Sequence, residues 1–175
     1  ALVYEPDKMN MEQLYQFLMN VSTALETMKV HQRQQNIISS LENKYIHDPL
    51  TGLLNRRGFY QKVLPDFNRC INEEKHFIAI SVDLNGLKKI NDTYGHSDGD
   101  IAISAIGNIL INSSFQDETC ARFGGDEFVM AGPLADGLDA NDFWDKIHQN
   151  INIYNKMHNH PYDVSASIGI ITGIP

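Results

Sequence analysis

The pattern of hydrophobic positions changes near residue 47. Between Pro6 and Pro49 there is neither glycine nor proline, which predicts one long helix. Its apolar residues follow the 4-3-4-3 spacing of a heptad seam: Leu14, Leu18, Val21, Leu25 and Met28. After Met28 the same register places Gln32 and Gln35 on the seam, which interrupts it. Two interpretations stay open: a stalk that pairs in parallel with a second copy, and an amphipathic helix packed on its own domain.

From His47 onward, patterns typical of strands and helices alternate. Apolar and β-branched runs predict strands at 77–84, 119–123, 128–131 and 163–172. Helices are predicted at 100–112, with Ile101, Ala105 and Ile109 on one face, and at about 141–158, with Phe143, Ile147, Ile151 and Tyr154 on one face. We therefore expect an α/β or α+β domain with a single sheet at 48–175, preceded by a helical stalk at 1–47.

Composition fits one globular domain with an appendage. The chain has 175 residues, 42% of them apolar and 21% charged, with 14 basic and 22 acidic residues and a net charge of −8. The first 47 residues carry 4 basic and 5 acidic groups, which leaves 10 and 17 for the rest. This balance argues against a nucleic-acid partner. Cys70 and Cys120 indicate neither a disulfide framework nor a zinc cage, which fits a cytoplasmic location.

No apolar stretch approaches the 18 or so residues of a membrane span, so we expect no membrane insertion by this piece. A longer parent protein could still carry a membrane or sensor portion.

Acidic residues gather at the ends of the predicted strands. Asp83 lies near the end of the first strand, and Asp126 and Glu127 follow Gly124 and Gly125 in a predicted hairpin turn whose missing side chains let a ligand approach the backbone. If strand and hairpin are neighbours, three carboxylates converge and their repulsion favours a bound cation. Oxygen ligands select Mg²⁺ or Mn²⁺, and Mg²⁺ implies substrate phosphates. The alternative is an ordinary solvated turn.

The run Gly124-Gly125-Asp126-Glu127-Phe128 is identified as the GGDEF signature of diguanylate cyclases. Other segments resemble the same family in order and at its spacing, over residues 48 to 175. They are 48–57 (DPLTGLLNRR), 82–92 (VDLNGLKKIND), Gly95-His96, Gly99-Asp100, Ala121-Arg122 and Ser167-Ile168-Gly169.

This resemblance implies a mixed, mainly antiparallel central sheet flanked by helices, as in nucleotidyl cyclases and polymerase palms. It also implies a bacterial signalling enzyme that joins two GTP into cyclic di-GMP with release of pyrophosphate, by attack of a 3′-hydroxyl on the α-phosphate. The implied catalytic residues are Asp83, Asp126 and Glu127. The metal ligands would be Asp83, the Leu84 carbonyl and Asp126, with Glu127 assisting, and Gly124 and Gly125 would lie against the substrate.

The same resemblance makes Asn91 and Asp100 the residues that read guanine. A carboxylate accepts the N1–H and N2–H of guanine together, whereas adenine offers no such pair. Lys88 would reach phosphate oxygens. The alternatives are ordinary structural roles: a helix C-cap for Asn91, a helix N-cap for Asp100 and a solvated surface for Lys88.

Forming two phosphodiester bonds needs two active sites face to face, so the resemblance implies a homodimer, held through the N-terminal helix and controlled by an upstream sensor domain in the intact protein. The alternative function is a catalytically silent domain that binds GTP or cyclic di-GMP as a receptor or scaffold.

The sequence departs from the family pattern at several positions. Asn85 and Leu87 replace the usual Asp and Phe, and both look tolerable. An inhibitory product site would need Arg at 115 and Asp at 118, where this chain has Phe115 and Glu118, so we expect no feedback inhibition there. The family continues past Pro175 with a helix and a turn that bear a Lys and an Arg for the nucleotide phosphates. We therefore expect a truncated piece, weakly active or inactive by itself.

Overall fold

The structure is a computed structural model that describes residues 10–116, 118–158 and 160–175, with residues 36–44 described by their backbone only. The chain divides into two compact units, Ala1–Asn43 and Lys44–Pro175. The long predicted helix is confirmed as α1 (Met11–Ile46), and the part of that prediction before Asn10 lies outside the described residues. A capping box starts α1, because Gln13 N donates to Asn10 Oδ1 at 2.8 Å and Asn10 N donates to Gln13 Oε1 at 3.4 Å.

Apolar side chains along α1 are open to solvent. The seam residues Leu18, Val21, Leu25 and Met28 are between 39% and 68% exposed, and Leu14 is half-buried. The helix therefore carries an apolar stripe with little cover. Among the described residues, no helix combines the length and the apolar character that crossing a membrane requires.

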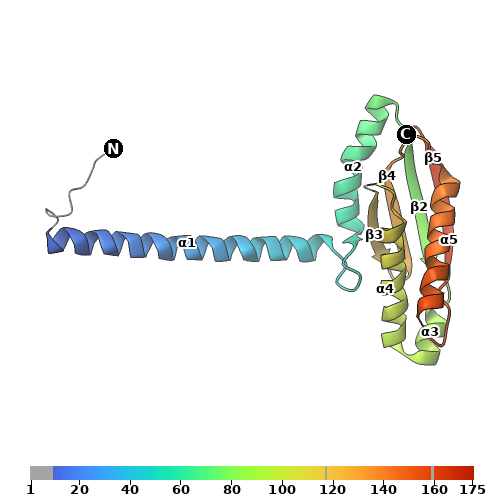
Figure 1. Cartoon of the computed structure of the whole chain (residues 1–175), viewed down its shortest axis with the longest axis horizontal. Helices are drawn as coiled ribbons and strands as arrows, with labels where there is room; N and C mark the ends of the chain where they lie inside the picture. Colours follow the sequence, from blue (N-terminus) through green and yellow to red (C-terminus); the bar gives the residue numbers. More distant parts are fainter. Residues whose placement is uncertain (1–9, 117, 159) are drawn as a thin grey trace. The chain divides into compact units, whose positions relative to one another are not determined.

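A single five-stranded sheet forms the centre of the second unit (Figure 1). Its strand order is β1-β3-β4-β2-β5, with β1 parallel to β3 and the other pairs antiparallel. The strands are β1 (Leu54–Asn55), β2 (Phe77–Leu84), β3 (Thr119–Gly124), β4 (Glu127–Pro133) and β5 (Ala166–Gly173). The expected mixed, mainly antiparallel sheet is confirmed, although β5 begins three residues later than predicted.

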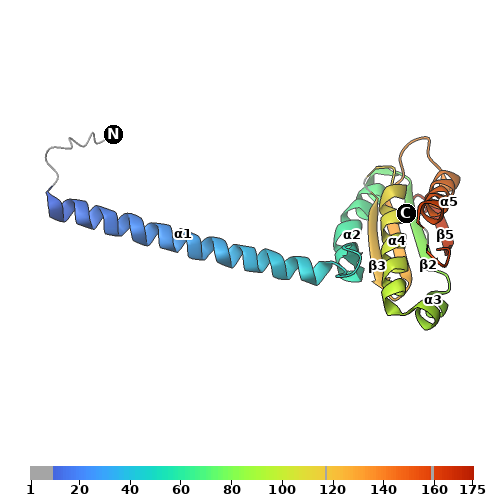
Figure 2. The same ribbon diagram turned by 60° about the horizontal axis from the view of Figure 1, so that its bottom comes forward.

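Helices cover both faces of this sheet. They are α2 (Arg56–Glu73), α3 (Leu87–Tyr94), α4 (His96–Ser113) and α5 (Ala140–Met157). Figure 1 shows α2 on one face and α4 and α5 on the other, and Figure 2 shows the same layers from a second direction. The α3 helix lies at the end of the sheet where α4 begins (Figure 1).

Alternation along β2 explains this layering and aims the site residues. Ile78, Ile80, Val82 and Leu84 are buried in the core with α4 and α5. Phe77 and Ala79 belong to the second cluster, which includes Phe59, Val63 and Cys70 of α2. Because successive strand side chains point to opposite faces, Asp83 shares the face that α2 partly covers. It is the penultimate residue of β2, and its side chain is exposed.

One of the two helix predictions needs correction. The helix predicted at 100–112 begins four residues earlier, as α4, and Ile101 is 42% exposed rather than buried. Its buried stripe runs through Ala102, Ala105, Ile106 and Ile109. Residues spaced at i, i+4 and i+8 drift by about 80° around a helix, so the predicted stripe leaves the core at its first residue. In α5 the predicted face is confirmed, with Phe143, Ile147 and Ile151 buried.

Candidate functional site

Acidic residues from two segments meet at one end of the sheet. In the antiparallel register of β2 and β4, Asp83 lies opposite Glu127, and both side chains are exposed. The Leu84 N–H donates to the Asp126 carbonyl at 3.0 Å, which ties the hairpin turn to the end of β2. Opposed residues in such a pair place their Cβ atoms about 5 Å apart on the same face. The strand and the hairpin are thus neighbours, which was the condition for their carboxylates to lie close together.

The turn before these carboxylates depends on glycine. Gly124 has φ 154° and Gly125 has φ 52°, values that other residues adopt only with strain. A Cβ atom at either position would meet no atom within 4 Å. The two glycines are therefore required for the backbone conformation of the turn, and not because a side chain would clash. They leave open space over the turn for a ligand.

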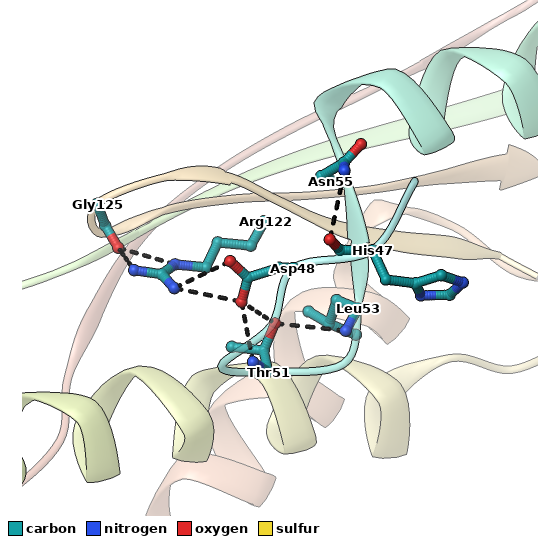
Figure 3. Close-up of polar contacts among 7 residues, drawn as sticks. All are labelled: His47, Asp48, Thr51, Leu53, Asn55, Arg122 and Gly125. Carbon is teal, nitrogen blue, oxygen red and sulfur yellow. Dashed lines mark hydrogen bonds and ion pairs between the residues drawn. The ribbon is translucent and has the colours of Figure 1, made fainter. Parts of the chain in front are cut away.

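The guanidinium of Arg122 holds this turn through hydrogen bonds to the Gly125 carbonyl (Figure 3). Arg122 donates from Nε and Nη2 to the Gly125 carbonyl at 3.0 and 2.7 Å. Its Nη1 donates to both carboxylate oxygens of Asp48, each at 3.2 Å. Thr51 donates to the same carboxylate from its N–H at 2.9 Å and its Oγ1 at 2.8 Å. We call these four residues the Arg122 clamp.

Strand pairing brings the clamp together. The short strand β1 runs parallel to β3 with Asn55 opposite Arg122, so the loop that carries Asp48 and Thr51 returns beside the arginine. The side chains of Arg122 and Asp48 are only 12% and 17% exposed. Burial raises the pKa of Asp48. The hydrogen bonds from Thr51, together with the hydrogen bond and charge of Arg122, lower it by more than burial raises it, so the net result is a lowered pKa. The carboxylate therefore stays ionised near neutral pH.

The residues expected to read guanine lie on α3 and α4. Asn91 is half-buried inside α3, and Asp100 is exposed inside α4. The two helices pack closely at Gly99, where a Cβ atom would lie 2.0 Å from Asn91 Oδ1. Both capping alternatives are wrong, because Gly95 is at once the C-cap of α3 and the N-cap of α4. Lys88 is exposed on α3, which leaves its two alternatives open.

The acidic edge offers a pair of carboxylates for a cation. Within the described part of the chain, no three or more His, Cys, Asp and Glu side chains form a group that could hold a metal ion. The expected convergence of three carboxylates is therefore not found among these residues, and the metal roles of Asp83, Leu84, Asp126 and Glu127 stay predictions. The opposed pair of Asp83 and Glu127 fits Mg²⁺ nonetheless, because this ion usually takes only one or two protein carboxylates.

A family comparison decides the relationship of this chain. The family model described as "Diguanylate cyclase, GGDEF domain" matches residues 45–175. The chain belongs to this GGDEF family. The bifunctional diguanylate cyclase/cyclic di-GMP phosphodiesterase MucR of Pseudomonas aeruginosa is 32% identical over 125 residues, which are 71% of this chain and 18% of MucR. Diguanylate cyclase DgcM of Escherichia coli is 35% identical over 100 residues, 57% of this chain and 24% of DgcM. The chain thus spans about a fifth of the length of these relatives.

Solved structures share the fold of this GGDEF domain. The coiled coil and GGDEF domain of DgcB from Caulobacter crescentus, in complex with c-di-GMP, has a TM-score of 0.73 at 19% identity, and the match covers 88% of this chain and 82% of that one. A fragment of TpbB from Pseudomonas aeruginosa comprising only the GGDEF domain has a TM-score of 0.64 at 28% identity, over 72% of this chain and 74% of that one. The architecture described above is therefore that of GGDEF domains.

One departure of this GGDEF domain from the family pattern has a clear structural role. Asn85 Oδ1 accepts a hydrogen bond from Ser167 Oγ at 2.8 Å, and Asn85 N–H donates to the Ser165 carbonyl at 2.9 Å. The amide thus links the end of β2 to β5. An asparagine at this position is compatible with the fold, as expected.

Sequence reasoning missed the Arg122 clamp as a functional unit. Asp48 and Arg122 stood out only as motif positions, 74 residues apart. The available signal was chemical, since a carboxylate and a guanidinium in the two motifs that flank one site are natural partners.

Proposed function

We propose that this GGDEF domain is the output domain of a diguanylate cyclase, which condenses two GTP into cyclic di-GMP and releases pyrophosphate. The observation that carries the proposal is the opposed pair of Asp83 and Glu127 beside the open Gly124-Gly125 turn. Two exposed carboxylates this close repel each other, so the arrangement favours a ligand that brings positive charge. The functions of MucR and DgcM, as their names state them, support the same reaction.

A divalent cation, Mg²⁺ or Mn²⁺, is the cofactor that this edge suits. Asp83, Asp126, Glu127 and the Leu84 carbonyl would hold it. When bound, the ion supplies positive charge that polarises the α-phosphate, helps deprotonate the attacking 3′-hydroxyl and offsets charge on pyrophosphate. The chain's own contribution is a fixed backbone, because the Arg122 clamp and the Leu84–Asp126 hydrogen bond hold the turn against β2.

Asn91 and Asp100 select guanine in this proposal. Contact with Gly99 restricts the Asn91 amide, and the exposed Asp100 carboxylate can accept two hydrogen bonds from the base edge. Adenine would leave that carboxylate unpaired, which favours GTP over ATP. Lys88, exposed on the first turn of α3, would contact phosphate oxygens.

The reaction also calls for two copies. Each domain holds one GTP, so two active sites face each other across a two-fold axis. The exposed stripe Leu18, Val21, Leu25 and Met28 supports parallel pairing of α1 into a homodimer, with an upstream sensor domain acting through it. DgcB, whose structure contains a coiled coil and a GGDEF domain, matches 88% of this chain.

Feedback by the product through residues 115–118 is not part of the proposal. Glu118 is 7% exposed, and its Oε2 accepts hydrogen bonds from Ser114 Oγ, from Phe115 N at 2.9 Å and from Gln116 N at 3.0 Å. The Phe115 ring packs edge-on against Phe143, with centroids 4.8 Å apart. The segment is therefore engaged with its own protein, and it presents no arginine to a phosphate.

The test combines product formation with nucleotide binding. The full-length protein is incubated with GTP and Mg²⁺, and cyclic di-GMP and pyrophosphate are quantified by chromatography. Asp126→Ala should abolish product, whereas Asp136→Ala, in the exposed turn that follows β4 at the end of the strand opposite the motif, should not. Tight GTP binding without product would favour the silent receptor, and absence of guanine-nucleotide binding would contradict both functions.

A further inference from the structure

The corner between α3 and α4 is fastened to the segment between α5 and β5 by two tyrosines. Tyr94, the last residue of α3, donates from its hydroxyl to the Pro161 carbonyl at 3.1 Å. Tyr162 donates from its hydroxyl to the Asp98 carbonyl, in the first turn of α4, at 2.8 Å. The two rings lie 5.4 Å apart with an interplanar angle of 36°. We call Tyr94 and Tyr162 the tyrosine clasp.

The segment that carries Tyr162 is itself anchored. Asn155 of α5 donates from Nδ2 to the Val164 carbonyl at 2.8 Å, and its Oδ1 accepts from the Val164 N–H at 2.9 Å. Val164 is 1% exposed and belongs to the main core. The Tyr162 hydroxyl therefore projects from a fixed backbone and not from a freely moving loop.

The clasp acts on the two helical turns that carry the proposed guanine-reading residues. Asn91 lies three residues before Tyr94, on the same helix, and Asp100 lies two residues after Asp98. Gly95, with φ 97°, joins the two helices and has no side chain that could fix their angle. The hydroxyl groups of Tyr94 and Tyr162 supply that restraint from outside.

We infer that Tyr94 and Tyr162 are positioning residues for guanine recognition, which hold Asn91 and Asp100 at a fixed separation. This inference rests on the proposed function. Two polar groups on different helices can bind one base edge together only if their spacing is kept, and small displacements weaken such recognition strongly. Burial, chiefly, and the charge of Asp98 raise the pKa of Tyr162 to about 12, so its hydroxyl remains a donor at neutral pH.

The test is Tyr162→Phe in the full-length protein, which keeps the ring and removes one hydrogen bond. The Kd for a non-hydrolysable GTP analogue, measured by calorimetry, should rise about three- to tenfold, the usual worth of one hydrogen bond. The Kd for inosine triphosphate, which lacks the N2 amino group, should rise less than the Kd for the GTP analogue. The preference of the protein for the guanine nucleotide should therefore shrink. In turnover, KM should rise while kcat at saturating GTP stays within about twofold.

The matched control is Tyr154→Phe. Tyr154 belongs to the same group of stacked rings, with its ring centroid 4.2 Å from that of His158. Among the described residues, its hydroxyl makes no hydrogen bond. Its Kd should stay within about twofold of wild type. If Tyr162→Phe fails to fold, Tyr94→Phe breaks the clasp from the other side and should shift Kd in the same direction.

Hydrogen exchange separates this inference from the proposed function. Without nucleotide, amides of residues 95–102 should exchange faster in Tyr162→Phe than in wild type, while the core of β2 stays unchanged. If wild type binds GTP but Tyr162→Phe binds it equally well, or shows unchanged exchange at residues 95–102, the inference is overturned and the proposed function stands. Faster exchange throughout the domain would mark a merely structural role and would also overturn it. Wild type that binds no guanine nucleotide overturns both proposals.

Discussion

Replacing Arg122 by methionine should destabilise the globular unit and loosen its Gly124-Gly125 turn. The substitution keeps most of the side-chain length and removes the guanidinium, which donates to the Gly125 carbonyl and to Asp48. The turn carbonyl then loses both of its donors from this side chain, and Asp48 keeps only the two hydrogen bonds from Thr51.

The size of the effect follows from burial. Removing one partner of a fully buried ion pair costs about 3–5 kcal/mol, and exposed pairs contribute about 0–1 kcal/mol. At 12% and 17% exposure, and with Thr51 still satisfying one Asp48 oxygen, this pair belongs between those limits. We expect a loss of about 2–3 kcal/mol in the free energy of unfolding. For a unit of about 130 residues, that corresponds to a fall of about 7–11 °C in Tm.

The measurement is thermal unfolding followed by circular dichroism, without divalent metal. Arg69→Met is the matched control, because Arg69 forms an exposed pair with Asp66 at 2.7 Å, with side chains 56% and 27% exposed. That variant should stay within about 0.5 kcal/mol of wild type. A double-mutant cycle of Arg122→Met with Asp48→Asn should give a coupling of about 1–2 kcal/mol.

Two results would refute this reasoning about the Arg122 clamp. One is an equal loss of stability in Arg122→Met and Arg69→Met, which would mean that burial of the pair does not matter. The other is strict additivity in the cycle with Asp48→Asn, which would mean that the two side chains do not stabilise each other.

Three further predictions test the acidic edge, the pH response and the stalk. Without divalent metal, Asp83→Asn should raise Tm by about 1–4 °C by relieving repulsion from Glu127, and Mg²⁺ should then stabilise it less than wild type. The folded-state pKa of Asp48 is lowered. The ionised carboxylate therefore stabilises the folded protein at pH values above its ordinary pKa of 3.8, and this stabilisation is lost as the pH falls through the folded-state pKa. The gap in Tm between wild type and Asp48→Asn should therefore stay constant above about pH 5 and shrink as the pH falls below 3.8. Leu25→Asp should convert a concentration-dependent dimer into a monomer in sedimentation velocity.

Local sequence patterns account for the parts of the fold that were predicted well. The strand at 77–84 matches β2 at both ends because an apolar, β-branched run makes a buried strand wherever it lies. The α2 helix was missed because Pro65 and Gly58 fall inside it, and both residues disfavour helix in isolation. The α3 helix has eight residues, too few to show a period. In both cases, packing against the rest of the domain decides the structure.

The site could be predicted only as far as local chemistry reaches. The sequence predicts Asp83 and the hairpin acids at strand ends, and the order of β2 and β4 makes them neighbours. The register that sets Asp83 opposite Glu127 depends on the whole length of the strand pair. The Arg122 clamp depends on the parallel pairing of β1, a strand of two residues that no periodicity reveals.

These long-range links explain how an exposed site can have defined geometry. Asp83, Glu127 and Asp100 are open to solvent, so packing around their own side chains does not fix them. Their backbones are fixed instead by polar links behind them: Arg122 to Asp48, Asn85 to Ser167, and Tyr162 to Asp98. Exposed charges can then bind a ligand without first breaking buried contacts. The conformational entropy of their backbones has already been lost on folding, so it is not lost again on binding. Under the proposed function, substitutions in these links should consequently change nucleotide affinity by moving the backbones that carry Asp83, Glu127 and Asp100.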